Sequence, residues 1–140
     1  MKYLIDTCVI SEFTKKTPDT KVIDFLNSVE QDDMYISVLS IGEIKKGIAK
    51  LHDINKQKDL SVWLNDVLLE NYKDNLADIN FQVIDKWGEM VGSYEKNGIV
   101  LPVIDSLLVA SAIYYDMIFV TRNIKDIKVL ECNYFNPWEK

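Results

Sequence analysis

The 140-residue sequence is poor in the side chains on which many metal sites and nucleophilic enzymes depend. It contains one histidine, His52, and two cysteines, Cys8 and Cys132. This excludes a zinc site built from several His or Cys ligands, and it excludes a ribonuclease mechanism that needs two histidines. The two cysteines are far apart and form no C-x-x-C pair, so no disulfide framework is predicted and a reducing cytoplasm is the expected location.

Other absences narrow the class of protein further. Five glycines and three prolines are too few for a collagen-like or disordered chain. No apolar run approaches the roughly 18 residues of a membrane span, and Asp6 interrupts the apolar start where a signal peptide would continue. With no repeats or linkers, and with 48% apolar residues, the sequence predicts one soluble domain over residues 1–140 and no membrane partner.

The net charge of −6 at first argues against a nucleic-acid ligand. However, residues 59–95 hold eight acidic and two basic side chains, which account for the whole excess. The rest of the chain is neutral, even with its candidate metal-binding acids included. The overall charge therefore describes one outer segment and does not exclude a nucleic-acid substrate at a site elsewhere.

Strand-like and helix-like segments alternate along the chain. Short apolar runs predict strands over 3–5, 34–38, 76–79, 118–121 and 129–130, and apolar residues at helical spacing predict helices over 19–30, 40–51, 59–73, 81–96 and 102–115. This alternation predicts an α/β fold, a three-layer sandwich in which helices flank a central, mostly parallel sheet. A ligand site is expected beyond the carboxyl ends of its strands.

Four acidic residues interrupt apolar sequence at comparable places. Asp6 and Asp126 follow predicted strands, and Glu43 and Asp105 lie in the first turns of predicted helices. In a parallel sheet these places share one edge, so the four carboxylates are expected to converge there. Such a cluster needs a counter-charge, and an all-oxygen site without His or Cys suits Mg²⁺ or Mn²⁺.

Each acid also has a structural alternative. Ser40 and Glu43 fit a capping box, in which the Glu side chain accepts from a backbone N–H at the start of its own helix. Asp105 fits the positive end of a helix dipole, Asp6 fits a helix cap, and Asp126 fits a solvated loop. For any one acid the structural role is the better prediction; four acids at matching ends favour a site.

Five segments, in order along the whole chain, carry the motifs YLIDTCVISE (3–12), ISVLSIGEIKKG (36–47), LPVIDSLLVA (101–110), VTRNIKD (120–126) and NPWE (136–139). Together they resemble the PIN-domain ribonucleases, and within these the FitB-like branch of the VapC toxins of toxin–antitoxin pairs. No single segment is specific, but five in register make a chance match an unsatisfactory explanation.

The resemblance implies that Asp6, Glu43 and Asp105 bind the metal, and that Thr7 is a polar neighbour of the metal and contacts the substrate. Many PIN domains have an acid where this chain has Asn123. VapC-like sequences often have Asn at this position and an acid three residues later, so the resemblance implies Asp126 as the fourth acid, with Asn123 as a neutral oxygen ligand or a substrate contact. The implied cofactor is Mg²⁺, for which Mn²⁺ can substitute.

The implied substrate is RNA. A chain with one histidine cannot use two of them to activate the RNA 2′-hydroxyl, so attack by metal-activated water is expected, leaving 5′-phosphate and 3′-hydroxyl ends. Arg122, the only arginine, suits a phosphate, although a surface ion pair explains it equally well. Lys46, with Lys45 and Lys50, can follow the RNA backbone, although lysines on an outer helix face are commonly just solvated.

The resemblance also implies partners: a second copy of the chain, and a cognate VapB-like antitoxin that lays a C-terminal segment into a groove beside the site. Helices over 19–30 and 41–73 could form that groove, or could be packed core.

The leading hypothesis is a metal-dependent endoribonuclease toxin. The alternatives are a non-catalytic PIN-like module that binds RNA or protein, which the Asn123 position suggests, and a nuclease of RNA processing or DNA cleavage outside a toxin–antitoxin system.

Overall fold

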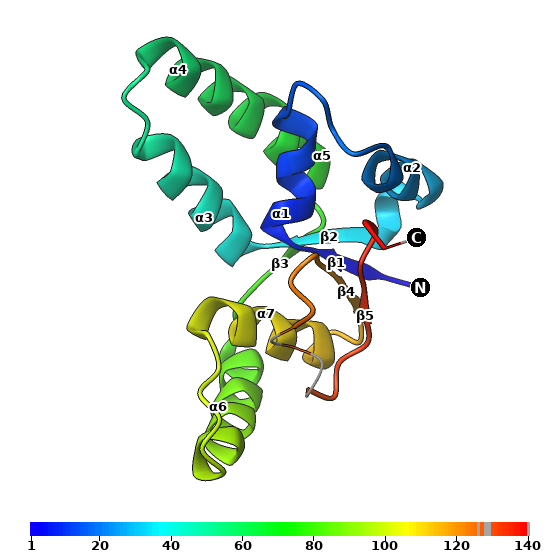
Figure 1. Cartoon of the computed structure of the whole chain (residues 1–140), viewed down its shortest axis with the longest axis vertical. Helices are drawn as coiled ribbons and strands as arrows, with labels where there is room; N and C mark the ends of the chain where they lie inside the picture. Colours follow the sequence, from blue (N-terminus) through cyan, green and yellow to red (C-terminus); the bar gives the residue numbers. More distant parts are fainter. Residues whose placement is uncertain (126, 128–129, 140) are drawn as a thin grey trace.

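A parallel β-sheet forms the centre of the molecule (Figure 1). The computed structural model describes residues 1–125, 127 and 130–139. Within these residues the strand order is β3-β2-β1-β4-β5, and every neighbouring pair is parallel. The strands are β1 (Tyr3–Ile5), β2 (Met34–Ser37), β3 (Leu76–Ala77), β4 (Ile118–Val120) and β5 (Tyr134–Phe135). The predicted α/β fold with a central parallel sheet is confirmed.

The sheet is apolar on both faces. Successive side chains of a strand point to opposite faces, so Leu4 and Phe119 join one hydrophobic core, and Ile5 and Val120 join the other. All four side chains are almost completely buried. A parallel sheet of this kind needs helices on both faces to exclude water.

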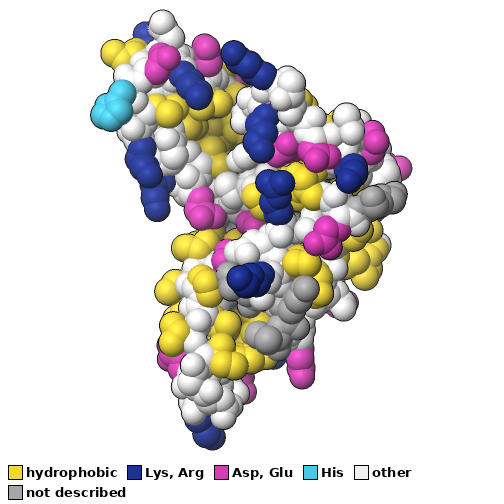
Figure 2. Space-filling model, viewed as in Figure 1, with side chains coloured by type: hydrophobic (Ala, Val, Ile, Leu, Met, Phe, Trp, Pro, Cys, Tyr) yellow, Lys and Arg dark blue, Asp and Glu magenta, His cyan; other side chains and the backbone are white. Residues whose placement is uncertain are grey.

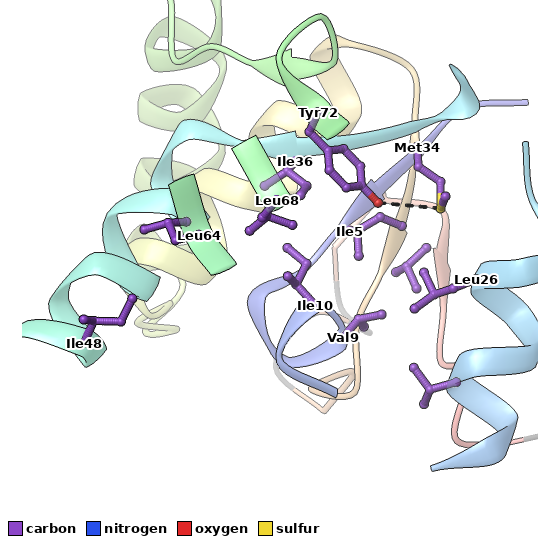
Figure 3. Packing of buried hydrophobic residues seen from close by; sticks show 12 residues of the cluster. Ile5, Val9, Ile10, Leu26, Met34, Ile36, Ile48, Leu64, Leu68 and Tyr72 are labelled. Carbon is purple, nitrogen blue, oxygen red and sulfur yellow. Dashed lines mark hydrogen bonds between the residues drawn. The ribbon is translucent and has the colours of Figure 1, made fainter. Parts of the chain in front are cut away.

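Helices cover each face, which confirms the three layers. The face with Leu4 and Phe119 carries two helices, α6 (Phe81–Lys96) and α7 (Val103–Tyr114). The face with Ile5 and Val120 carries the remaining elements: α1 (Thr7–Ile10), the 3₁₀ turns η1 (Ser11–Thr14) and η2 (Gln31–Asp33), α2 (Thr20–Ser28), α3 (Val38–Ala49), α4 (Ile54–Val62), the π-helical segment η3 (Trp63–Leu68) and α5 (Leu69–Tyr72). Figure 3 shows side chains from these helices and strands packed together, with the Tyr72 hydroxyl 4.0 Å from Met34 Sδ.

Helix α3 begins earlier than the sequence predicted. Ser37, not Ser40, is the N-cap, and its side-chain oxygen accepts from Leu39 N at 3.1 Å. Ser40 is buried inside the helix, and its hydroxyl has no hydrogen-bond partner among the described residues. The predicted Ser40–Glu43 capping box is therefore wrong, and Glu43 lies in the second turn, free of the helix start.

Other differences concern element ends. The helix predicted over 59–73 begins at Ile54, because Asp53 caps it by accepting from two backbone N–H groups, and it continues through η3 to Tyr72. The strand predicted at 129–130 is not formed at Leu130, and Val129 lies outside the described residues. No pattern in the sequence indicated α1, η1, η2 or β5, which are short. No described helix is both long enough and apolar enough to cross a membrane.

Candidate functional site

Asp6 and Thr121 meet where two adjacent strands end. Ile5 pairs with Val120 in the sheet, so the next residue of each strand lies beside the other, and Asp6 N donates to Val120 O at 2.9 Å. Thr121 Oγ1 donates to Asp6 Oδ2 at 2.7 Å. Both residues are buried, with 8% of Asp6 and 1% of Thr121 exposed. The pairing of β1 and β4 thus fixes one oxygen of the Asp6 carboxylate.

The other oxygen of Asp6 is fixed by the start of α1. Thr7 N donates to Asp6 Oδ1 at 2.8 Å, so Asp6 is the N-cap of this helix. The structural alternative for Asp6 is therefore true in part. It does not account for Oδ2, which also accepts from the Cys8 thiol at 3.5 Å. Contacts from two directions leave the carboxylate with one orientation.

Glu43 is connected to Asp6 through Thr7. Thr7 Oγ1 donates to Glu43 Oε1 at 3.0 Å, while the Thr7 backbone N–H caps onto Asp6. This contact joins α1 to α3 through two residues that are 36 positions apart in the sequence. Because α3 starts at Val38, the Glu43 carboxylate is available for it.

Asp105 is connected to the same group from the opposite layer. It lies in the first turn of α7, and Asn123 Nδ2 donates to Asp105 Oδ2 at 3.1 Å. Asn123 N also donates to Thr121 Oγ1 at 3.1 Å. Hydrogen bonds therefore link Glu43, Thr7, Asp6, Thr121, Asn123 and Asp105 in one series, the carboxylate network.

The carboxylate network contains three of the four acids that the sequence predicted, together with Thr7 and Asn123. Asp126, the fourth predicted acid, lies outside the described residues. Thr121 was not anticipated as a site residue. The available signal was its place: a polar side chain directly after an apolar strand, as Asp6 is after β1.

Burial keeps the Cys8 thiol neutral. Desolvation, followed by the negative charge of Asp6, raises the pKa of Cys8 from 9.0 to about 11, against smaller opposing contributions from the backbone N–H of Arg122 and from Thr121. A protonated thiol can donate to Asp6, whereas a thiolate would repel it. Cys8 is thus an uncharged support for the carboxylate.

The donor atoms of the carboxylate network suit a hard divalent cation. They are carboxylate, hydroxyl and amide oxygens, with no histidine, and Mg²⁺ and Mn²⁺ prefer such ligands. Among the described residues, no three His, Cys, Asp or Glu side chains are close enough to enclose an ion. An ion held here would therefore keep water among its ligands, which is usual for Mg²⁺.

The two predicted cationic contacts lie apart from the carboxylates. Lys46 is exposed on α3, one turn beyond Glu43. Arg122 directs its side chain to Trp138, with Cζ 4.7 Å from the ring centroid. Both residues are therefore close in sequence to members of the carboxylate network. Neither the guanidinium of Arg122 nor the ammonium of Lys46 takes part in the hydrogen bonds described for that network.

A groove beside the network carries lysines that the sequence analysis missed. It has a volume of about 670 Å³, and Thr7 and Glu43 line it together with Lys15, Lys16 and Lys56. Its apolar lining comes from α3, α4 and η3. Figure 2 shows a hydrophobic hollow in the upper half of this face with Lys and Arg side chains around it. The Lys15-Lys16 pair, nine and ten residues after Asp6, was the only available sequence signal.

Comparisons with known proteins agree on the fold. The model of the PIN domain family matches residues 3–129. The toxin FitB of Neisseria gonorrhoeae is 24% identical over 96% of this chain and 97% of its own length. Ribonuclease VapC2 of Rickettsia felis is 24% identical over the full length of both chains. The crystal structure of FitAcB from Neisseria gonorrhoeae superposes with a TM-score of 0.91 at 25% identity, covering 99% of each chain.

Proposed function

The chain belongs to the PIN-domain family, as the sequence resemblance predicted, and from this premise we propose that it is a divalent-metal-dependent endoribonuclease and the toxin of a toxin–antitoxin pair. The observation that supports this most is the carboxylate network. Asp6, Glu43 and Asp105 come from three distant segments and are joined through Thr7, Thr121 and Asn123. A set of capping residues would not need such connections.

We propose that Asp6, Glu43 and Asp105 hold the cation together, partly through water molecules because the three carboxylates are not close enough to enclose it directly. Asp126 is the proposed fourth acid, and Mg²⁺ is the proposed ion, for which Mn²⁺ can substitute. When bound, the ion supplies an activated water and neutralises charge on the phosphate. The hydrogen-bonding residues of the chain then orient the carboxylates. Thr121 and Thr7 N hold Asp6, and Asn123 holds Asp105, so that the carboxylates keep their arrangement while the substrate binds.

The proposed substrate is single-stranded RNA. The groove that begins at Thr7 and Glu43 offers Lys15, Lys16 and Lys56 for backbone phosphates. Thr7, Asn123, Arg122 and Lys46 are the substrate contacts expected from the sequence. This assignment is supported by the name of the Rickettsia felis relative, a ribonuclease that matches the chain from end to end.

The proposed partners are a cognate VapB-like antitoxin and a second copy of the chain. For the antitoxin, the groove combines an apolar wall with three lysines beside Glu43, so a segment bound there would block the carboxylate network.

For the homodimer, large apolar side chains are exposed on α6, α7 and their connection, including Phe81 (76%), Val100 (79%) and Val103 (60%). Light scattering of the purified chain tests the dimer, which Val100→Asp is expected to weaken.

Cleavage of a labelled single-stranded RNA tests the proposed activity. We expect antitoxin-free protein with Mg²⁺ or Mn²⁺ to cut the RNA, and we expect chelation and Asp6→Asn each to abolish cutting. The matched control is Asp53→Asn, which also changes an N-cap acid but lies at the start of α4. Equal cutting by wild type and Asp6→Asn would exclude this site as its source.

The alternative of a non-catalytic binding module is tested by titration with Mn²⁺. A nuclease site predicts binding that Glu43→Gln weakens, whereas a module without a working site predicts no binding that depends on Glu43. A nuclease outside a toxin–antitoxin system is distinguished by the neighbouring gene, which in a toxin pair encodes a small antitoxin-like protein.

A further inference from the structure

The only arginine of the chain is stacked on a tryptophan of the C-terminal segment. Arg122 is exposed, and its Cζ lies 4.7 Å from the centre of the Trp138 ring. A guanidinium over an indole face is attracted by the ring and keeps its N–H donors at the edge available. The contact therefore holds the side chain in one place without using its hydrogen bonds.

Trp138 is itself held by several contacts. β5 pairs with β4, and Thr121 N donates to Phe135 O at 3.0 Å, which ties the end of the chain to the strand that carries Thr121. Trp138 N donates to Asn136 Oδ1 at 2.9 Å, and Lys21 Nζ to Trp138 O at 3.4 Å. The ring packs against the hydrophobic core on the α1 side of the sheet.

No ion pair with a described residue accounts for the position of Arg122. Burial raises the pKa of Glu12, and the contacts with Lys15 and with Asp19 N lower it below the ordinary value. The charge of Arg122 lowers this pKa as well, but it contributes less than Lys15 and Asp19 N. Lys15 Nζ lies 2.8 Å from Glu12 Oε2, and Asp19 N donates to Oε1 at 2.9 Å. Among the residues described, no carboxylate lies within ion-pair distance of Arg122.

The backbone of Arg122 belongs to the edge of the proposed active site. Its neighbours in the chain, Thr121 and Asn123, are members of the carboxylate network. The backbone N–H of Arg122 is close enough to the Cys8 thiol to lower its pKa, and this thiol donates to Asp6. A fixed guanidinium one residue from these groups is placed to bind a negatively charged ligand that reaches the network.

We propose that Arg122, positioned by Trp138, binds a backbone phosphate of the RNA next to the one that is cleaved, so that the C-terminal segment forms part of the substrate site. This rests on the proposed function. Arg122 is then the binding residue, because its fork suits a phosphate, and Trp138 is a positioning residue that acts through it.

The test separates binding from cleavage. Binding of a fluorescein-labelled single-stranded RNA is measured by anisotropy across a salt series, in an Asp6→Asn background without divalent metal. A plot of log affinity against log salt has a negative slope, and Arg122→Gln is expected to make this slope less steep by about 0.7, the value for one phosphate contact on a single strand. The matched control is Lys2→Gln, because Lys2 also lies over an aromatic ring, that of Tyr35 at 5.3 Å, but at the opposite end of β1. It is expected to leave the slope unchanged.

The role of Trp138 is tested by cleavage kinetics with Asp6 intact. Trp138→Leu is expected to raise KM about three- to tenfold with little change in kcat, and Trp138→Tyr, which keeps a ring, is expected to recover most of the loss. Thermal unfolding checks that each variant is folded; Arg122→Gln, a surface change, decides the matter if Trp138→Leu unfolds.

Two results would overturn the inference: an unchanged salt slope in Arg122→Gln, or equal KM values for folded Trp138→Leu and wild type. If wild type does not cleave RNA, the proposed function fails, and the anisotropy series still decides whether Arg122 binds a phosphate.

Discussion

Thr121 Oγ1 donates a 2.7 Å hydrogen bond to Asp6 Oδ2 across 115 positions of sequence, at the edge where β4 and β1 end. The same hydroxyl accepts from Asn123 N, which leads to Asp105. One buried threonine therefore connects the acid at the end of β1 to the acid at the start of α7. Removing its hydroxyl is expected to disturb both sides of the carboxylate network.

Thr121→Val keeps the shape of the side chain and removes the hydroxyl. It leaves Asp6 Oδ2 and Asn123 N each short of a partner, so the free energy of unfolding should fall by roughly 1–3 kcal/mol. The cleavage rate should fall as well, while Thr121→Ser, which retains the hydroxyl, should stay near wild type. Denaturant unfolding and single-turnover cleavage measure the two effects. A Thr121→Val protein with the wild-type rate would show that the connection is not needed.

The start of α3 can be tested with two serines three positions apart. Ser37→Ala removes the side-chain cap on Leu39 N and should lower the free energy of unfolding by about 1 kcal/mol. Ser40→Ala removes a buried hydroxyl without a described partner and should be neutral or stabilising. Denaturant unfolding of both variants measures the difference. The reverse order would support the capping box that the sequence suggested.

Glu12 should contribute to stability in a pH-dependent way. Burial alone would raise its pKa, but Lys15 and Asp19 N together hold the pKa below the ordinary 4.5. A lowered pKa in the folded state means that the stabilisation is present above pH 4.5 and is lost as the pH falls through the folded-state pKa. Glu12→Gln should therefore lower the free energy of unfolding by about 1 kcal/mol at pH 7, and less in acid.

Glu70 provides the matched control for Glu12. It also forms an ion pair with a lysine three residues later, Lys73, at 2.9 Å, but both side chains are more than 60% exposed. Glu70→Gln should leave the free energy of unfolding nearly unchanged, because an exposed ion pair contributes little to stability. Equal effects of the two substitutions would contradict the importance of burial at Glu12.

The cysteines should be unreactive in the folded protein. Burial raises the pKa of Cys8 and of Cys132 from 9.0 to about 11, so at pH 8 the thiolate fraction of each is about a hundredfold below that of an ordinary cysteine. Iodoacetamide should label them slowly in the native protein and rapidly after denaturation, as measured by mass spectrometry. Rapid labelling of native Cys8 at pH 8 would show that the thiol is exposed or ionised.

The sequence predicted those parts of the fold that depend on local pattern. The apolar runs of β1 and β4 and the helical spacing of α6 and α7 decide the layers, and the parallel order places Asp6 and Thr121 at one edge. Caps were harder, because Ser37 and Ser40 have the same side chain. Both are fully buried, and they differ in position: strand β2 ends at Ser37, so the helix begins directly after it.

Features that depend on contacts between distant segments were not predictable. Trp138 lies over Arg122 only because β5 pairs with β4, and β5 is two residues long. Lys56 lines the groove because Asp53 starts α4 five residues earlier than the apolar pattern indicated. Both positions depend on backbone pairing or capping that leaves no periodic signal.

The central claim, that the carboxylate network cuts RNA by attack of water, is tested most directly by mapping the 5′ ends of cellular RNA after induced expression of the chain. The account predicts new 5′-phosphate ends within single-stranded regions, absent when Asp6→Asn is expressed to the same level. The same new ends with both proteins, or ends that carry a 5′-hydroxyl, would contradict it.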